Sequence, residues 1–341
     1  MFRFRGHKCR ALVKALVVVF WVCCAAYGLA WSQGQSRGLV NPAITDAADP
    51  FITLSDNEYL LLATHENSIT IWSGTSLAAL TQNPKVVWKP SDAMKQVWSP
   101  TLWQMQGSWW IYFTAEYPGG QHGIYVLQSK TDDPLGEYTL RGRLELGKAA
   151  IDPSVLRVRD ATYLMYVDVD PQGWNAVWMT PLKDPMTPDG DGRQLIFPDM
   201  PWERGAGTTH NYPVAEGPTA LYHAGKTFIV YSGRDTGAHV YCLGLLSYRG
   251  TGDPMLAENW EKGGPVFSYS AEHGVYGPGR GTFTTSPDGK QDWLVYHAKS
   301  VKEYTYAGRS VRMQPFTWDA DGKPKFGVPV AEGALTLKAA K

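Results

Sequence analysis

The stretch that indicates the fold is IDPSVLRV (residues 151–158), followed by the polar pair Arg159-Asp160 and then by ATYLMYV (residues 161–167). An acid and a proline open the first run, and the second run is rich in Tyr and other large apolar residues. β-Branched and aromatic residues in short runs, separated by turn residues, are typical of a β-hairpin. The stretch therefore predicts two antiparallel strands joined by a tight turn.

The same pattern occurs five times along the chain. It aligns on Pro50, Pro100, Pro153, Pro218 and Gly281, at intervals of 50, 53, 65 and 63 residues. Repeats at such a period indicate supersecondary units that are stacked or arranged radially. Helical periodicity long enough to cover a parallel sheet is missing, and radial repetition of four-stranded sheets protects the strand edges. The sequence thus predicts an all-β fold, a five-bladed β-propeller.

The N-terminus has the pattern of a secretory signal. Residues 1–14 carry five basic residues and no acidic residue, and residues 15–30 form an uncharged apolar run. That run is short for a membrane-spanning helix, which needs roughly 20 residues. We expect a signal peptide over residues 1–30, a flexible leader over 31–40 and the propeller over 41–341, in a secreted or periplasmic protein. The alternative is an uncleaved signal anchor, and no other membrane association is expected.

Charge and cysteine content exclude several other functions. Without residues 1–30, the chain keeps 27 basic and 32 acidic residues, a net charge near −5. A mildly acidic protein disfavours nucleic acid and anionic membrane surfaces as partners. Cys242 is then the only cysteine, and in an apolar run it is expected to be a buried, inert thiol. Zinc-ligand spacing and a dinucleotide-binding glycine motif are both missing.

Charged residues occur at the start of several repeats. The residues immediately before the five aligned positions are Asp49, Ser99, Asp152, Gly217 and Arg280. Glu216 precedes Gly217. In a propeller these positions converge at one end of the central channel, so three carboxylates and one guanidinium are expected there. Clustered like charges are costly unless they bind a ligand or shift their pKa values. Each acid alone is explained as well by capping of local amides, but three in register favour a functional site.

Five segments also match the motif order of one enzyme family. They are Asn41-Pro42 with ADPFI (48–52), VWSPTLW (97–103), AIDPSV (150–155), VAEGP (214–218), and RSVRMQPF (309–316) with DGKP (321–324). In these segments the chain resembles glycoside hydrolase family 43, whose five-bladed propeller enzymes include α-L-arabinofuranosidases, endo-arabinanases and β-xylosidases. The resemblance implies that Asp49 is the general base, Glu216 the general acid and Asp152 the residue that tunes the acid and orients the substrate.

These roles agree with the chemistry of glycosidic bond hydrolysis with inversion. That reaction needs a protonated carboxyl on the leaving oxygen and, roughly 6.5–9.5 Å away, a carboxylate that activates water. An ionised Asp152 near Glu216 would raise the pKa of the acid. The resemblance implies no required cofactor, and it implies an oligosaccharide or polysaccharide that contains arabinose or xylose as the substrate.

Two positions depart from the family pattern. Thr101 stands where the family has a Glu in the blade-two motif. Arg280 stands where many relatives have a His that belongs to a metal or water site on the propeller axis. A cation there disfavours an axial Ca²⁺, which prefers clustered oxygen ligands, so no metal ligand is assigned. Arg280 either fills the axial cavity or reaches a substrate hydroxyl.

The candidates for substrate binding are Trp98, Trp103, Arg280, His297 and Arg312. The two tryptophans stack on a sugar or fill the gaps between blades. His297 contacts substrate or an axial ion, or is a hydrogen-bonded structural residue. Arg309 and Arg312 are in the closing strand, where either bridges a channel acid and one of them is expected to be only a solvated charge. The loop 208–212 forms part of a sugar subsite or only a linker.

Taken together, the residues and the family resemblance imply an exo-acting, inverting α-L-arabinofuranosidase that acts on plant polysaccharide or arabino-oligosaccharides. A β-xylosidase and an endo-arabinanase are the alternatives within the family. A non-catalytic sugar-binding propeller is the alternative from another class. The presence of Asp49, Asp152 and Glu216 together counts against it, because binding alone requires no proton donor.

Overall fold

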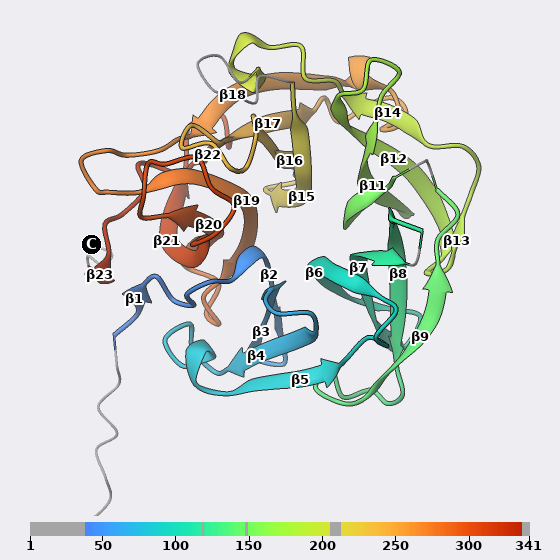
Figure 1. The fold of residues 1–341 in the computed structure, drawn as a ribbon. Helices are drawn as coiled ribbons and strands as arrows, with labels where there is room; N and C mark the ends of the chain where they lie inside the picture. The colour runs from blue at the N-terminus through green and yellow to red at the C-terminus, as the bar shows by residue number, and fades with distance from the viewer. Residues whose placement is uncertain (1–37, 118, 147–148, 205–212, 336–341) are drawn as a thin grey trace, which may run out of the picture. The chain divides into compact units, whose positions relative to one another are not determined.

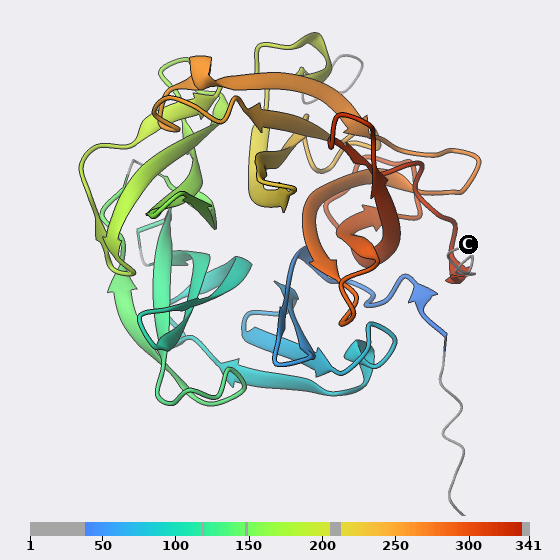
Figure 2. The same cartoon turned by 180° about the vertical axis from the view of Figure 1, so that it is seen from behind.

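The computed structural model describes residues 38–117, 119–146, 149–204 and 213–335. Within these residues, five antiparallel sheets follow one another around a central axis, as Figures 1 and 2 show from opposite sides. The sheets have four strands each, except the third, in which β14 also pairs with β12. The prediction of an all-β, five-bladed propeller is confirmed.

Each blade runs outward from an inner strand. Blade one comprises β2 (Ala48–Ser55), β3 (Glu58–Thr64), β4 (Ile69–Gly74) and β5 (Pro84–Trp88). Blade two comprises β6 (Lys95–Met105), β7 (Ser108–Tyr117), β8 (Gln121–Ser129) and β9 (Tyr138–Arg143). Blade three comprises β10 (Ile151–Val158), β11 (Ala161–Val169), β12 (Asn175–Asp184), β13 (Thr187–Pro188) and β14 (Arg193–Ile196).

The last two blades are formed in the same way. Blade four comprises β15 (Ala215–His223), β16 (Lys226–Gly233), β17 (Cys242–Tyr248) and β18 (Trp260–Phe267). Blade five comprises β19 (Tyr276–Thr285), β20 (Asp292–Lys299), β21 (Ser310–Trp318) and β22 (Pro324–Lys325). The helical elements of the described residues are three short 3₁₀ helices, Leu80–Gln82, Pro201–Glu203 and Ala257–Asn259.

The hairpin predicted from residues 151–167 is formed by β10 and β11, which pair in antiparallel register from Val158 opposite Ala161. Alternate side chains of β10 enter different cores: Val155 packs between blades two and three, and Leu156 between blades three and four. The described residues form five such buried clusters, one between each pair of neighbouring blades. Because strand side chains alternate, each blade buries both of its faces and the ring has no open sheet face.

The N-terminal segment of the described chain is attached to blade five. β1 (Val40–Asn41) pairs with β23 (Gly333–Ala334), and the Asn41 side chain exchanges two hydrogen bonds of 2.8 Å with the backbone of Met313. The predicted signal peptide and most of the predicted leader lie outside the described residues. The last two leader residues belong to the fold, because Leu39 is buried and Val40 begins β1.

All five inner strands contain a bulge at the same place. The residue before each aligned position has a left-handed backbone: φ is 49° at Asp49, 49° at Ser99, 55° at Asp152, 59° at Gly217 and 52° at Arg280. The strand register is interrupted there in every blade. Four of the five residues are not glycine, and such strained positions persist only where surrounding contacts hold them, often at functional sites.

Two further observations concern single features. Cys242, on β17, is a buried free thiol whose pKa burial raises to about 12, as expected for an inert cysteine. Of the parts of the chain that the structure describes, no helix has both the length and the apolar character to span a membrane.

Candidate active site

The five bulges expose backbone amides, and four of them are bound by a side chain from the second strand of the preceding blade. Asp49 N–H donates to Nδ1 of His297 (3.0 Å), and Ser99 N–H donates to Oγ1 of Thr64 (2.8 Å). In the next two such contacts, Asp152 N–H donates to Oγ1 of Thr114 (3.0 Å), and Arg280 N–H donates to Oγ of Ser232 (2.8 Å). These bonds satisfy the backbone groups that the bulge removes from the ladder.

The amide of Gly217 is the exception. Its bulge packs on blade three. There the strand register places Val167 at the position that a residue with a hydroxyl group holds in three other blades, namely Thr64, Thr114 and Ser232. Valine has no acceptor. Gly217 N–H instead donates to Oδ2 of Asp152 at 3.0 Å.

Asp49 is held as a carboxylate. Thr64 Oγ1 donates to its Oδ2 (2.8 Å), and Arg309 Nη1 donates to its Oδ1 (3.5 Å). Burial alone would raise the pKa of Asp49, but the guanidinium of Arg309, the largest of the opposing effects, holds this pKa well below its ordinary value of 3.8. The expectation that Arg309 bridges a channel acid is confirmed. Asp49 is therefore ionised at neutral pH, as a general base must be.

His297 binds the backbone amide of Asp49. Its side chain has no exposed surface, and burial lowers its pKa, so the ring is neutral. Because Asp49 N–H donates to Nδ1, this nitrogen is the acceptor and the proton is on Nε2, which lies 3.5 Å from Thr236 Oγ1. His297 thus fixes the backbone of Asp49.

Asp152, on blade three, is contacted by residues of three other blades. Ser99 Oγ donates to its Oδ1 (2.6 Å), Gly217 N–H donates to its Oδ2 (3.0 Å), and Arg280 Nη1 lies 3.2 Å from the same Oδ2. One of these three contacts is with a guanidinium, whose charge is complementary to a carboxylate. Asp152 therefore places a negative charge beside Glu216, the residue that precedes Gly217.

Glu216 also accepts hydrogen bonds, but the charges that act on it are those of carboxylates rather than of a guanidinium. Tyr241 donates a hydrogen bond from its hydroxyl to Oε1 (2.8 Å), and the Asn175 amide contacts Oε2 (3.4 Å). Burial, and then the charge of Asp152, raise the pKa of Glu216 to about 8. Glu216 is consequently protonated at neutral pH. Two carboxyl groups whose environments push their pKa values apart are the arrangement that acid and base catalysis requires.

Arg280 fills the axial position at this mouth. Its side chain is 4% exposed and pairs with Asp152, and a Cβ on Gly217 would lie 2.8 Å from its Cδ. Of the two roles considered from the sequence, its burial favours filling the cavity over contact with a substrate hydroxyl. The donor set around a guanidinium does not suit Ca²⁺, and the described residues contain no group of three or more His, Cys, Asp or Glu placed to hold a metal ion.

The prediction of substrate contact is wrong for three residues. His297 and Arg312 have no exposed surface, and Arg312 instead donates to Ser300 Oγ (2.9 Å) and pairs with Glu332 (2.7 Å). Trp103 lies four residues down β6 from Ser99, away from the carboxylates. Its ring packs against Phe51 of blade one with centroids 4.9 Å apart, so it fills a gap between blades.

Trp98 stays a prediction. It is half-buried, directly precedes Ser99, and its ring is stacked on His122 with centroids 4.6 Å apart. In the strand register it occupies the position that Glu216 holds in blade four, because both residues pair just before the bulge. The loop 208–212, the other candidate sugar contact, lies outside the described residues.

Apart from Arg309, sequence reasoning missed the partners of the channel residues. Thr64, Thr114 and Ser232 lie at or near the end of the second strand of their blades, and an alignment of those strands would have found a polar residue there. Tyr241 follows a loop of blade four, and nothing in its spacing indicates contact with Glu216. Contacts made by loops depend on a path that periodicity does not describe.

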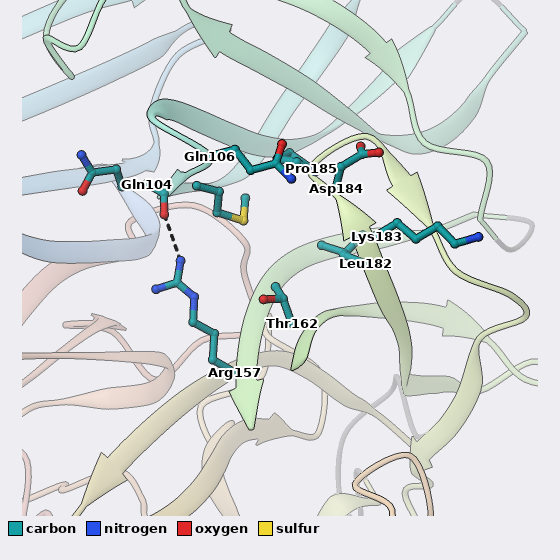
Figure 3. Close-up of a pocket in the computed structure, with 9 residues that line it drawn as sticks. Gln104, Gln106, Arg157, Thr162, Leu182, Lys183, Asp184 and Pro185 are labelled. Carbon is teal, nitrogen blue, oxygen red and sulfur yellow. Dashed lines mark hydrogen bonds between the residues drawn. The ribbon is translucent and has the colours of Figure 1, made fainter. Parts of the chain in front are cut away.

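A separate cavity of about 310 Å³ lies at the other end of blades two and three (Figure 3). It is lined by strand-end and turn residues of these blades, and Arg157 there donates to the carbonyl of Gln104 at 2.9 Å. None of the three carboxylates lines it. Asp49, Asp152 and Glu216 lie toward the opposite end, near the start of the inner strands.

Comparisons with known proteins agree with this geometry. The chain is 33% identical over 318 residues to an extracellular exo-α-(1→5)-L-arabinofuranosidase of Streptomyces avermitilis, an alignment that covers 87% of this chain and 65% of that protein. It therefore spans just under two thirds of that relative. A protein of the same description from Streptomyces chartreusis is 30% identical over 294 residues, covering 82% of this chain and 88% of the relative.

A solved structure and a family model complete the comparison. The crystal structure of α-L-arabinofuranosidase from Lactobacillus brevis superposes with a TM-score of 0.79 at 28% identity, covering 86% of this chain and 97% of that one. The model described as glycosyl hydrolases family 43 matches residues 40–324, from β1 to the start of β22. The expected family is thus shown: this chain belongs to glycoside hydrolase family 43.

Proposed function

We propose that this protein is an inverting, exo-acting α-L-arabinofuranosidase that removes terminal arabinofuranosyl units from arabinose-containing oligosaccharides or polysaccharide. The observation that carries the proposal is the contrast between two carboxyl groups. Arg309 and Thr64 stabilise Asp49 as a carboxylate, whereas burial and Asp152 keep Glu216 protonated. This division of roles is what inversion at a glycosidic carbon requires.

In the proposed reaction, Glu216 donates its proton to the glycosidic oxygen while the bond from that oxygen to the anomeric carbon breaks. Asp49 takes a proton from a water molecule, whose oxygen forms a new bond to the anomeric carbon from the opposite face. The sugar leaves with inverted configuration, Asp49 is left protonated and Glu216 is left ionised. Proton exchange with solvent restores both groups.

The choice of sugar rests on the relatives. The Streptomyces proteins are named as exo-α-(1→5)-L-arabinofuranosidases, and a Humicola insolens relative, 31% identical over 345 residues, is named as an α-L-arabinofuranosidase. The Streptomyces names also include the word extracellular. Together with the signal pattern in residues 1–30, this supports a secreted or periplasmic location.

The test compares p-nitrophenyl α-L-arabinofuranoside with p-nitrophenyl β-D-xyloside, using the purified protein, Asp49→Asn and Glu216→Gln. We expect turnover of the arabinoside, loss of activity in Asp49→Asn, and a β-configured first product by NMR. Preferential turnover of the xyloside would replace the proposed sugar, and an α-configured product would contradict inversion. Sugar binding without turnover of either glycoside or of arabinan would favour the non-catalytic propeller.

A further inference from the structure

We propose that Tyr304 and Tyr306, on the loop 300–309 between β20 and β21, bind the sugar unit on the leaving side of the scissile bond and so give the enzyme its preference for arabinose chains over isolated arabinosides. This inference rests on the proposed function, because it assigns residues to the leaving group of that reaction. It is argued from the exposure of the two rings, their links to the catalytic acids and the way in which their loop is held.

Both tyrosines present aromatic surface at the catalytic end of the propeller. Tyr304 is 36% exposed and Tyr306 is 52% exposed, and their loop directly follows the end of β20 at which His297 supports Asp49. Tyrosine combines an apolar ring face with a polar hydroxyl. A sugar has a complementary surface, with apolar C–H groups on one face and hydroxyls around the ring.

Hydrogen bonds connect Tyr306 to both sides of the site. Arg309 donates from Nε to the backbone oxygen of Tyr306 (3.0 Å) and from Nη1 to Asp49 (3.5 Å). The Tyr306 hydroxyl donates to Oδ2 of Asp235 (3.4 Å). Asp235 belongs to the loop that leads to Tyr241, the residue that contacts Glu216. Tyr306 is therefore linked to Asp49 through Arg309, and to the loop that carries the Glu216 partner through Asp235.

The loop is fixed by a buried cation. Lys299 has no exposed surface, and its Nζ donates to the carbonyl oxygens of Gly237 (2.5 Å), Glu303 (3.2 Å) and Thr305 (3.1 Å). The last two residues flank Tyr304. In addition, Thr305 N–H donates to the same carbonyl of Gly237 at 3.0 Å. A buried ammonium is costly unless its donors are satisfied, so loss of these hydrogen bonds would be unfavourable. Because the acceptors belong to loops of blades four and five, the contacts hold the two loops together.

The rings themselves are held at a defined angle. The two hydroxyl groups are 2.7 Å apart, and the ring centroids lie 5.7 Å apart with planes at 73°. Tyr304 also packs against the backbone of Gly237, where a Cβ would lie 2.8 Å from its Cζ. The rings thus form an angled wall that is ordered before a ligand binds, which lowers the entropic cost of binding.

The experiment compares two substrates whose leaving groups differ in size. α-1,5-L-Arabinotriose places a sugar on the leaving side, whereas α-L-arabinofuranosyl azide has a leaving group too small to fill that side. For Tyr304→Ala and Tyr306→Ala, we expect kcat/KM on arabinotriose to fall by about tenfold or more, a loss typical of an aromatic anchor, with activity on the azide almost unchanged. Tyr306→Phe keeps the ring and should retain most activity.

The matched control is Tyr222→Ala. Tyr222 is 49% exposed, but its hydroxyl accepts a hydrogen bond from Arg157 N–H at the opposite end of the propeller. We expect it to behave like the wild type on both substrates. Equal losses on both substrates in the Tyr304 and Tyr306 variants, or no loss on arabinotriose, would overturn the subsite. A wild-type protein that hydrolyses neither substrate would contradict the proposed function itself.

Discussion

The backbone amide of Gly217 donates a 3.0 Å hydrogen bond to Oδ2 of Asp152. In the other four blades the equivalent amide is bound by a side chain from the second strand of the preceding blade. Blade three has Val167 there, so the amide after Glu216 is bound by the neighbouring carboxylate instead. The one break in the five-fold pattern thus places the negative charge of Asp152 beside the proposed general acid.

The pH dependence of activity follows from the two carboxyl groups. The active form has Asp49 ionised and Glu216 protonated, so kcat/KM should be flat across the mildly acidic range and fall with a midpoint near the Glu216 pKa of about 8. The low pKa of Asp49 places the acidic limb below about pH 4. A pH profile of kcat/KM on an aryl arabinofuranoside checks both limbs. A basic limb near the ordinary glutamate value of 4.5 would contradict the assignment of Glu216.

Stability should also depend on Glu216. Its folded pKa is raised from 4.5 to about 8, so between these values the folded protein holds a proton that the unfolded chain releases. The free energy of unfolding therefore decreases as pH rises through this window. A glutamine at position 216 does not titrate, so Glu216→Gln does not share this loss. The Tm of Glu216→Gln minus the Tm of the wild type should therefore increase from pH 5 to pH 8.

The control for that comparison is Glu332→Gln, for which the sign is reversed. Hydrogen bonds from Ser300 and Arg312 lower the pKa of Glu332, so its contribution to stability is present above 4.5 and is lost as pH falls. Glu332→Gln should lower Tm at neutral pH and have less effect in acid. A constant Tm difference between Glu216→Gln and wild type across the pH range would contradict the raised pKa of Glu216.

Gly217→Ala tests the packing of the axial arginine. The new Cβ would lie 2.8 Å from Cδ and 3.1 Å from Nη1 of Arg280, at a φ of 59° that disfavours alanine. Displacement of Arg280 disturbs Asp152, and we expect kcat to fall by about tenfold or more, the effect of a small misplacement in a catalytic site.

Gly225→Ala is its matched control, with a φ of 76° and no atom within 4 Å of the added Cβ. It should cost on the order of 1 kcal/mol of stability from backbone strain and leave kcat unchanged. Kinetics and thermal unfolding of both variants separate the two effects. A similar kcat for both would show that contact with Arg280 is unimportant.

His297 should act through the backbone of Asp49. His297→Leu removes the acceptor of the Asp49 amide and should cost about 1–3 kcal/mol of stability, the penalty of an unsatisfied buried donor, and should lower kcat more than it changes KM. His297→Asn offers a side-chain oxygen as an acceptor and should recover part of both losses. Thermal unfolding and steady-state kinetics measure these effects. Loss in KM alone would instead indicate direct substrate contact.

Much of the site was predictable because it depends on the repeat. The aligned prolines placed Asp49 and Asp152 at the starts of two inner strands and Glu216 near the start of a third strand. Closure of the ring brings the starts of these strands together. Arg312 was misjudged for a reason of local geometry. On β21, Val311 and Met313 pack toward blade one, and alternation turns Arg312 to the other face. Which face is which depends on the neighbouring blade.

The sequence alone thus determined five blades, the family and the three carboxylates, because these follow from a repeated pattern of strands and turns. Only the tertiary structure decided which contacts set the pKa values of these carboxyl groups. Tyr241 contacts Glu216, and Arg309 contacts Asp49, each from a loop. Because Val167 offers no acceptor, the Gly217 amide donates to Asp152 instead. The pKa of a carboxyl group depends on its burial and on charges within a few ångströms, and those neighbours come from segments far apart in the chain.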